Sequence, residues 1–169
     1  MIPFRVHLRQ RSHLETALYA VIAGTLAAVL LYRLLELSAM AEKTAMEATV
    51  ARLQTALYAR AAKAVLSGEP RVALDWQTRN PVALAHAQLP NYLGEFDHPD
   101  LAELEPGNWL YDRSRHELVY LVRRAQGFSG GGDPVVPAIR FRLRLERGAS
   151  GAYLPALLRP AVPYEWNPE

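Results

Sequence analysis

The amino-acid sequence predicts an α+β protein in which a long N-terminal helix, first transmembrane and then amphipathic, packs on a small antiparallel β-sheet. Three observations predict this fold. An almost uncharged apolar stretch occupies residues 14–32, strong helix formers without proline fill residues 33–66, and eleven of the twelve prolines come later. Because the chain has 169 residues, half of them hydrophobic, it has room for one globular domain and an appendage.

Charge and cysteine content exclude several classes of function. The formal net charge is +2, and residues 1–13 carry Arg5, Arg9 and Arg11 without any acid, so the remainder is close to neutral. The basic character therefore belongs to a tail rather than to a nucleic-acid-binding face, and we expect no nucleic-acid partner. The sequence has no Cys, which excludes disulfides, thiolate metal sites and a cysteine nucleophile.

Residues 14–32 have the properties of a membrane span. They read LETALYAVIAGTLAAVLLY, with Glu15 as the one charge. A helix of this length spans roughly 28 Å, close to the hydrocarbon core of a bilayer at about 30 Å. Apolar residues surround the helix instead of forming one stripe, which favours a transmembrane helix over a buried core helix. Since the basic residues precede the span, the positive-inside rule predicts a cytoplasmic tail at residues 1–13.

A cleavable signal peptide is the alternative to a retained anchor. Residues 39–41 read AMA, the small-x-small form of a cleavage site. The apolar stretch is longer than the usual 7–15 residues, however, and Arg33 and Glu36 fall in the region that would be cleaved, so we expect retention.

One face of the predicted span is lined by small residues. Ala20, Gly24 and Ala28 recur every four residues, which lets another helix approach closely. We predict that this face packs against other membrane helices.

Residues 33–66 predict a continuation of the helix beyond the membrane, although a break at 33–38 that would give two helices stays open. An apolar stripe at spacings of three and four residues should pack on the domain. The stripe consists of Val50, Leu53, Leu57, Ala61 and Ala64. Ser67, Gly68 and Pro70 then provide the signals that end a helix.

Residues 67–152 predict a small α+β domain built from short elements. We expect mainly loop at 80–106 with one short helix at 82–87, a β-hairpin from 108–111 and 117–122, and a Gly/Pro loop at 127–137. Residues 153–169 contain four prolines and predict an extended C-terminal tail, with Tyr164 and Trp166 as possible attachments to the domain.

The clearest strand pattern lies at residues 138–147. Its apolar face consists of Ile139, Phe141, Leu143 and Leu145, and its charged face of Arg140, Arg142, Arg144 and Glu146. We expect the charged face to lie in water. Arg140, Arg142 and Arg144 are then candidates for docking an acidic partner; the alternative is an ordinary charged strand face that discourages edge pairing.

Three further patterns point to chemistry, and in each the structural interpretation is favoured. Residues 127–131 match G-x-S-x-G, but the Gly and Pro residues that follow exclude the helix of a nucleophile elbow. A group of metal-ligand residue types fits no EF-hand spacing and predicts a solvated acidic loop. That group is Asp97, His98, Asp100, Asp112 and His116. Trp109, Tyr111 and Tyr120 predict a hairpin core rather than a ligand-binding shelf. We therefore expect no catalytic residue, metal or cofactor.

Short stretches of this sequence resemble those of type IV pilin-like proteins and pseudopilins, notably small membrane proteins of mannose-sensitive haemagglutinin (MSHA) pilus loci. They are NPVAL at 80–84, PNYLG at 90–94, and GNWLYD at 107–112 followed by ELVY at 117–120. The resemblance covers most of residues 14–147. It implies a single-pass protein of a bacterial inner membrane with a periplasmic domain, and partners among pilus or type II secretion assembly proteins, with no small-molecule substrate.

One position departs from the pilin pattern. Aligning Glu15 with the glutamate of pilins places Gln10 and Arg11 at the peptidase cut, where pilins carry Gly or Ala followed by a Phe-type residue. This favours a non-enzymatic, permanently anchored accessory protein. Two alternatives stay open: a minor pilin or pseudopilin within the fibre, and a periplasmic enzyme or ligand-binding protein released after Ala41.

Overall fold

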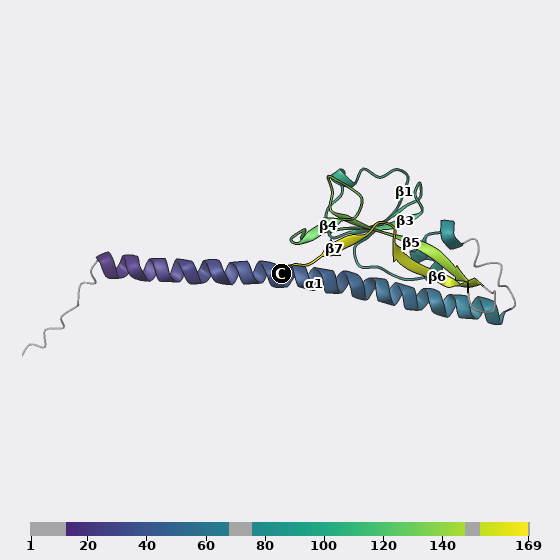
Figure 1. The fold of residues 1–169 in the computed structure, drawn as a ribbon, viewed down its shortest axis with the longest axis horizontal. Helices are drawn as coiled ribbons and strands as arrows, with labels where there is room; N and C mark the ends of the chain where they lie inside the picture. The colour runs from purple at the N-terminus through teal and green to yellow at the C-terminus, as the bar shows by residue number, and fades with distance from the viewer. Residues whose placement is uncertain (1–12, 68–75, 148–152, 169) are drawn as a thin grey trace, which may run out of the picture. The chain divides into compact units, whose positions relative to one another are not determined.

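The computed structural model describes residues 13–67, 76–147 and 153–168 (Figure 1). The chain divides into two compact units between Leu37 and Ser38. The elements in chain order are α1 (His13–Leu66), α2 (Pro81–Ala85), β1 (Tyr92–Phe96), the 3₁₀ turn η2 (Leu101–Glu103), β2 (Trp109–Asp112), β3 (Glu117–Leu121), β4 (Phe128–Gly130), β5 (Ala138–Arg147), β6 (Tyr153–Pro160) and β7 (Tyr164–Trp166). The basic tail predicted at residues 1–13 lies, apart from His13, outside the described residues.

The first unit contributes helical residues of α1 whose side chains are exposed. Leu26 keeps 66% of its surface exposed and Leu14 82%. Among the described residues, α1 is the one helix long and apolar enough to span a membrane, and the apolar window in it has no buried residue. These findings are compatible with a single-pass membrane protein.

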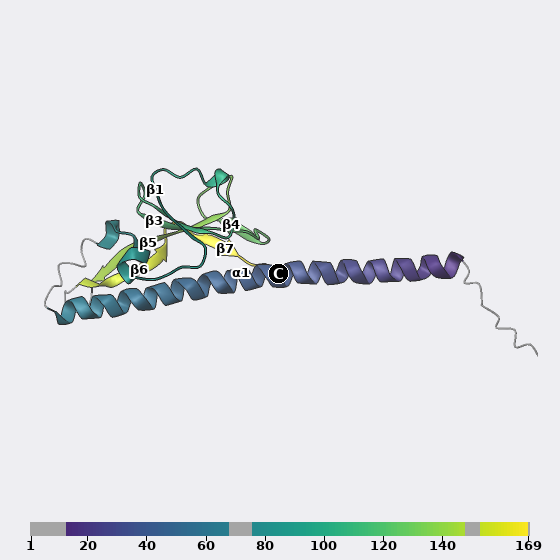
Figure 2. The same cartoon turned by 180° about the vertical axis from the view of Figure 1, so that it is seen from behind.

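In the second unit, the remaining part of α1 packs on the sheet through the predicted stripe. Leu53, Leu57 and Ala61 are buried, while Val50 and Ala64 are half-buried. Figures 1 and 2 show the strands gathered along one side of this part of the helix. The prediction of a helix packed on a small sheet is thus confirmed, and α1 ends at Leu66 as the sequence signals indicate.

The main sheet has five strands in the order β1-β2-β3-β5-β6. The predicted hairpin is β2 and β3, with Trp109 opposite Tyr120 and Asp112 opposite Glu117. The predicted strand at 138–147 is β5, which pairs antiparallel with β3. The sheet is mixed rather than purely antiparallel, because β1, which the sequence analysis placed in a loop, runs parallel to β2.

The C-terminal segment is not an extended tail. Strand β6 pairs with β5 along the edge of the main sheet, and β7 pairs with β4 in a separate two-stranded sheet. Leu158 and Trp166 are both buried. Proline is compatible with β6 because an edge strand needs amide donors on one side only. The domain boundary predicted at residue 152 is therefore wrong.

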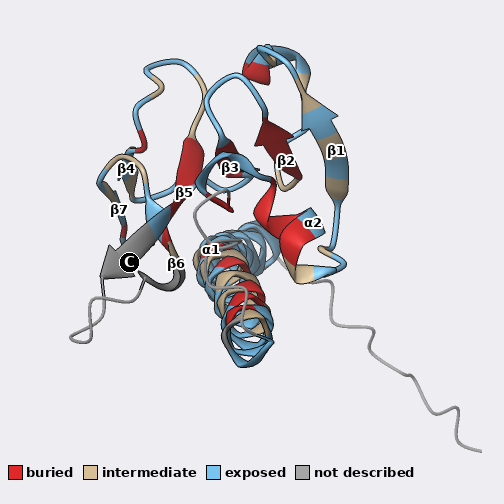
Figure 3. Ribbon diagram, turned by 90° about the vertical axis from the view of Figure 1, so that its right-hand side faces the viewer, coloured by how far each residue is buried: buried red, intermediate tan, exposed pale blue. Residues whose placement is uncertain are grey.

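Apolar side chains form a core on each face of the sheet. In the ribbon of Figure 3, buried positions are red and mark the central strands β2, β3 and β5. On the face towards α1, the ring of Trp109 lies 4.7 Å from that of Tyr120 and 6.0 Å from that of Phe141. Tyr111 is also buried, so the prediction that these aromatic residues form a core is confirmed. On the opposite face lies a second cluster, which consists of Leu101, Leu110, Val119, Leu121 and Ala138.

Candidate functional site

The small residues of the predicted membrane face lie exposed on α1. Ala20, Gly24 and Ala28 are exposed, and a Cβ atom built at Gly24 would meet nothing within 4 Å. The described residues therefore leave room for a neighbouring helix on this face. Packing against a membrane partner stays a prediction.

The expectation that Arg140 faces water is wrong. Its side chain is only 7% exposed, and its guanidinium lies 3.5 Å from a carboxylate oxygen of Glu117, 3.5 Å from one of Asp133 and 4.0 Å from one of Asp112. The physical reason is that the second face of the sheet is covered rather than solvated. Side chains from 96–104 and Val136 pack over it. Arg140 is thus excluded as a docking residue.

The two other arginines of the predicted docking face are exposed. Arg142 is 45% exposed and donates a hydrogen bond of 2.6 Å to Glu117. Arg144 is exposed as well. The three-residue arginine face is therefore reduced to two residues, one of which is already paired.

The buried charges around Arg140 hold three segments together. Asp112 accepts hydrogen bonds from the amides of Ser114 and Arg115, which close the β2–β3 turn. Asp133 accepts from the amides of Val135 and Val136. These amides, together with nearby Arg140, hold the pKa of Asp133 below its ordinary value of 3.8. Since buried charges require partners, this cluster has a structural role.

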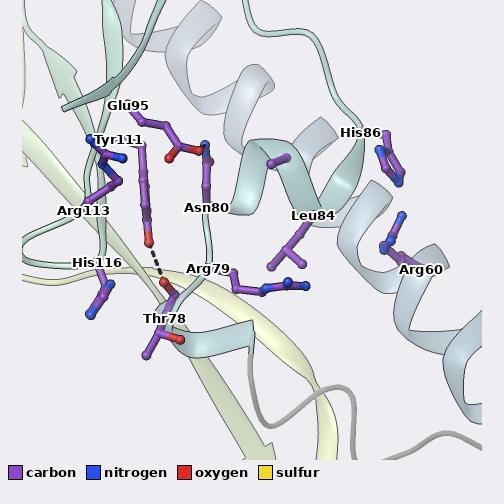
Figure 4. A pocket seen from close by; sticks show the side chains of 11 residues that line it. Arg60, Thr78, Arg79, Asn80, Leu84, His86, Glu95, Tyr111, Arg113 and His116 are labelled. Carbon is purple, nitrogen blue, oxygen red and sulfur yellow. Dashed lines mark hydrogen bonds between the residues drawn. The ribbon is translucent and has the colours of Figure 1, made fainter. Parts of the chain in front are cut away.

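A polar cleft that the sequence analysis did not predict lies in the second unit (Figure 4). It encloses about 510 Å³. The side chains that line it come from α1, from residues 78–80, from α2 and its C-terminal end, from β1 and from the β2–β3 hairpin. They are Arg60, Thr78, Arg79, Asn80, Ala83, Leu84, His86, Glu95, Tyr111, Arg113 and His116.

Asn80 fixes one wall of this cleft. Its side-chain oxygen accepts a hydrogen bond from the amide of Val82 at 2.9 Å, which caps the N-terminus of α2. Its amide nitrogen donates to Glu95 at 2.7 Å and to the hydroxyl of Tyr92 at 2.8 Å. Asn80 thereby links α2 to β1 and holds one oxygen of the Glu95 carboxylate in place.

Tyr111 borders the same cleft, although almost all of its side chain is buried. Its hydroxyl donates a hydrogen bond of 3.1 Å to the carbonyl of Thr78, as Figure 4 shows. Burial, and secondarily the charge of Glu95, raise the pKa of Tyr111 to about 12. The phenol therefore stays neutral at physiological pH and adds no negative charge to the cleft.

The lining of the cleft is predominantly cationic. Among the described residues that line it are three arginines and one acidic residue, Glu95. Arg113 also forms an ion pair of 2.7 Å with Asp97, in which both side chains are more than half exposed. Such an arrangement suits an anion.

The residues considered for chemistry in the sequence do not form a reactive centre. Ser129 lies exposed in β4, opposite Glu165, and the chain continues into a turn instead of a helix. Asp112 lies next to the acidic loop, opposite Phe96 in the sheet, but its carboxylate belongs to the buried cluster around Arg140. Within the described ranges, no three His, Cys, Asp or Glu side chains gather where they could hold a metal ion.

Sequence reasoning missed the cleft because its residues are separated by up to 56 positions, from Arg60 to His116. The one local signal is Asn80 followed by Pro81, a typical start of a helix.

No protein-family model, no curated protein and no solved structure matches this chain. The resemblance to pilin-like proteins consequently gains no support from these comparisons, and a pilus or secretion role is a matter for proposal.

Proposed function

We propose that this protein is a non-enzymatic, single-pass protein of a bacterial inner membrane, whose periplasmic domain helps to assemble or anchor an MSHA-like type IV pilus or a related type II secretion apparatus. The observation that carries the proposal is the exposure of the apolar part of α1. No residue in this apolar stretch is buried, whereas the second unit has its own apolar core. Covering a Leu or Val side chain stabilises by about 1.5–3 kcal/mol, which a bilayer supplies along the whole stretch.

The surroundings of the possible signal-peptidase site at residues 39–41 support a retained anchor. Residues 39–41 lie inside α1, and Ala39 is fully buried. Glu42, the next residue, accepts hydrogen bonds from the hydroxyl of Tyr120 and the amides of Arg123 and Arg124. Cleavage after Ala41 would have to unwind this packed helix and remove Ala39 from the core.

The assembly role rests on surfaces rather than on a reactive centre. The face formed by Ala20, Gly24 and Ala28 would pack on membrane helices of other assembly proteins. A soluble partner would contact the domain. Type IV pilin-like proteins, which the sequence resembles, have a membrane-spanning helix prolonged into an amphipathic helix, followed by a small sheet. The helix-on-sheet arrangement of the second unit fits that layout and so supports the proposal.

The intact mass of the protein from native membranes, periplasm and sheared surface fibres tests the proposal. Full-length protein confined to the inner membrane is the expected result. A species that begins near Arg11 in fibres would show a processed fibre subunit instead. A soluble periplasmic species that begins at Glu42 would overturn the membrane anchor and reopen the ligand-binding and enzyme alternatives.

Membrane packing has its own test. Gly24→Leu should reduce crosslinking between the protein and its membrane partners, because the larger side chain keeps the helices apart. Ala23→Leu adds a similar volume about 100° away around the helix and serves as the matched control. Equal crosslinking by both variants and the wild type would remove the proposed role of this face.

A further inference from the structure

We propose that the cleft in Figure 4 binds a short acidic segment of a partner protein, whose carboxylates pair with Arg60 and Arg113. This inference deepens the proposed function. It rests on that function in one respect, namely that the partner is a protein. It replaces the docking site that the burial of Arg140 removes.

The first argument is the convergence of cations from distant segments. Arg60 comes from α1, Arg79 from the residues before α2, and Arg113 from the β2–β3 turn. Residues 54–66 of α1 contain no Asp or Glu. The positive charge of Arg60 is therefore not balanced by a carboxylate from the same turns of the helix. Guanidinium groups are planar, permanently charged and shaped to hold carboxylates with two parallel hydrogen bonds.

The second argument is that the rim of the cleft already holds a carboxylate. The side chain of Asp97 accepts a hydrogen bond of 2.7 Å from Arg113. This ion pair is largely exposed, with 52% of Arg113 and 61% of Asp97 accessible, so it contributes little to stability. A carboxylate from a partner can replace Asp97 on Arg113 at little cost.

The third argument concerns the size and the mixed lining of the cleft. The volume of about 510 Å³ is in the range of sites that bind a ligand with several chemical groups, and it exceeds the volume of one inorganic anion. The exposed side chain of Ala83 adds apolar surface beside the charges, which suits the carbon atoms of peptide side chains. An acidic peptide matches this combination better than a free phosphate does.

Glu95 makes the two ends of the cleft differ in charge. One of its oxygens is held by Asn80, and in Figure 4 it lies at the end of the cleft near Arg113, whereas Arg60 and His86 lie together at the other end. Because Glu95 repels a nearby carboxylate, an acidic segment should place most of its charge at the Arg60 end. Glu95→Gln should therefore tighten binding of an acidic peptide two-fold or more.

Fluorescence anisotropy with a labelled hexaglutamate peptide and the full-length protein in detergent tests this inference. We expect saturable binding that Arg60→Glu weakens at least ten-fold. Arg52→Glu changes an exposed arginine of the same helix outside the cleft and should bind like the wild type. Unlabelled hexaglutamate should compete, whereas equimolar inorganic phosphate should not. Both arginine variants should keep the wild-type midpoint of thermal unfolding, which excludes misfolding as the cause.

Several outcomes would overturn the inference. Equal weakening by Arg60→Glu and Arg52→Glu would indicate general attraction between charges, and competition by phosphate as strong as by peptide would indicate a simple anion site. Weakening by Arg142→Glu but not by Arg60→Glu would place the docking face on β5. Since the assay uses purified protein, its failure is distinguishable from failure of the proposed function, which the intact masses report.

Discussion

Two stretches of the same helix, α1, are both rich in apolar residues and differ in how those residues are covered. Before Ser38, Leu18, Leu26 and Leu34 are more than half exposed; after it, Leu53 and Leu57 are almost completely buried. The first stretch is apolar on all sides, while the second concentrates its apolar side chains in one stripe. A stripe can be covered by one sheet, but an apolar surface on all sides needs a surrounding medium such as lipid.

The largest expected difference between the two stretches comes from placing the same charge in each. Leu57→Asp should unfold the domain, because it removes a buried side chain worth roughly 2–5 kcal/mol and leaves an unpaired carboxylate in the core. Leu26→Asp should leave the domain folded and reduce membrane insertion, at a cost of about 3 kcal/mol. Tryptophan fluorescence during urea unfolding and membrane fractionation measure the two effects. Loss of domain stability in both variants would break the comparison.

A second prediction concerns the sheet that packs on the apolar stripe of α1, and specifically the face of this sheet that points away from the helix. Arg140→Met should destabilise the domain by about 3–5 kcal/mol, because Asp112 would remain buried without its cation and Glu117 would keep only the partly exposed Arg142. Arg144→Met, on the same strand but exposed, should change the free energy of unfolding by less than about 0.5 kcal/mol. The same urea titration checks both variants. A neutral Arg140→Met would show that the buried cluster is dispensable.

These elements also show what the sequence could and could not predict. Strand β5 was predicted to the residue, because its alternation is uninterrupted, and the stripe of α1 followed from helical periodicity. Alternation shows which residues share a face but not whether a loop covers that face, so the burial of Arg140 was missed. Strand β1 was missed because Gly94, at a φ of +110°, interrupts its pattern and its partner is parallel.

The candidate site was predictable to a lesser degree than the fold. The cleft joins Arg60, Asn80 and Arg113, which come together only through tertiary packing. Strands β6 and β7 were mistaken for a tail because prolines dominate the local sequence, whereas pairing with β5 and β4 decides the structure. The small residues Ala20, Gly24 and Ala28 were chosen from their spacing alone, and their packing against membrane helices stays a prediction.

A third prediction concerns the start of the second stretch. Glu42→Ala should cost about 1–3 kcal/mol, because the hydroxyl of Tyr120 and the amides of Arg123 and Arg124 lose their acceptor. It should also lower the pKa of Tyr120, which burial and, secondarily, Glu42 raise above its ordinary value of 10. Urea unfolding and ultraviolet titration measure these two changes. Glu47→Ala, at an exposed position of the same helix, is the control and should leave the Tyr120 pKa unchanged.

The smallest expected effect is a dependence of domain stability on acid. The pKa of Asp133 is lowered in the folded protein, so its contribution is present above pH 3.8 and is lost as the pH falls through the folded value. Asp133→Asn should therefore flatten the decline of the unfolding midpoint below about pH 4. The pH series should leave the exposure of Leu26 unaffected. An unchanged decline in the variant would assign the acid sensitivity to other carboxylates.

Cysteine labelling tests the central claim, that the first stretch of α1 is a membrane span, most directly. Because the sequence has no Cys, each of Ser12→Cys, Leu26→Cys and Ser129→Cys carries a single thiol. With a membrane-impermeant maleimide on intact spheroplasts, we expect labelling of Ser129→Cys at once, of Ser12→Cys only after permeabilisation, and of Leu26→Cys only after solubilisation and unfolding. Labelling of Leu26→Cys as fast as Ser129→Cys in intact spheroplasts would contradict the membrane span.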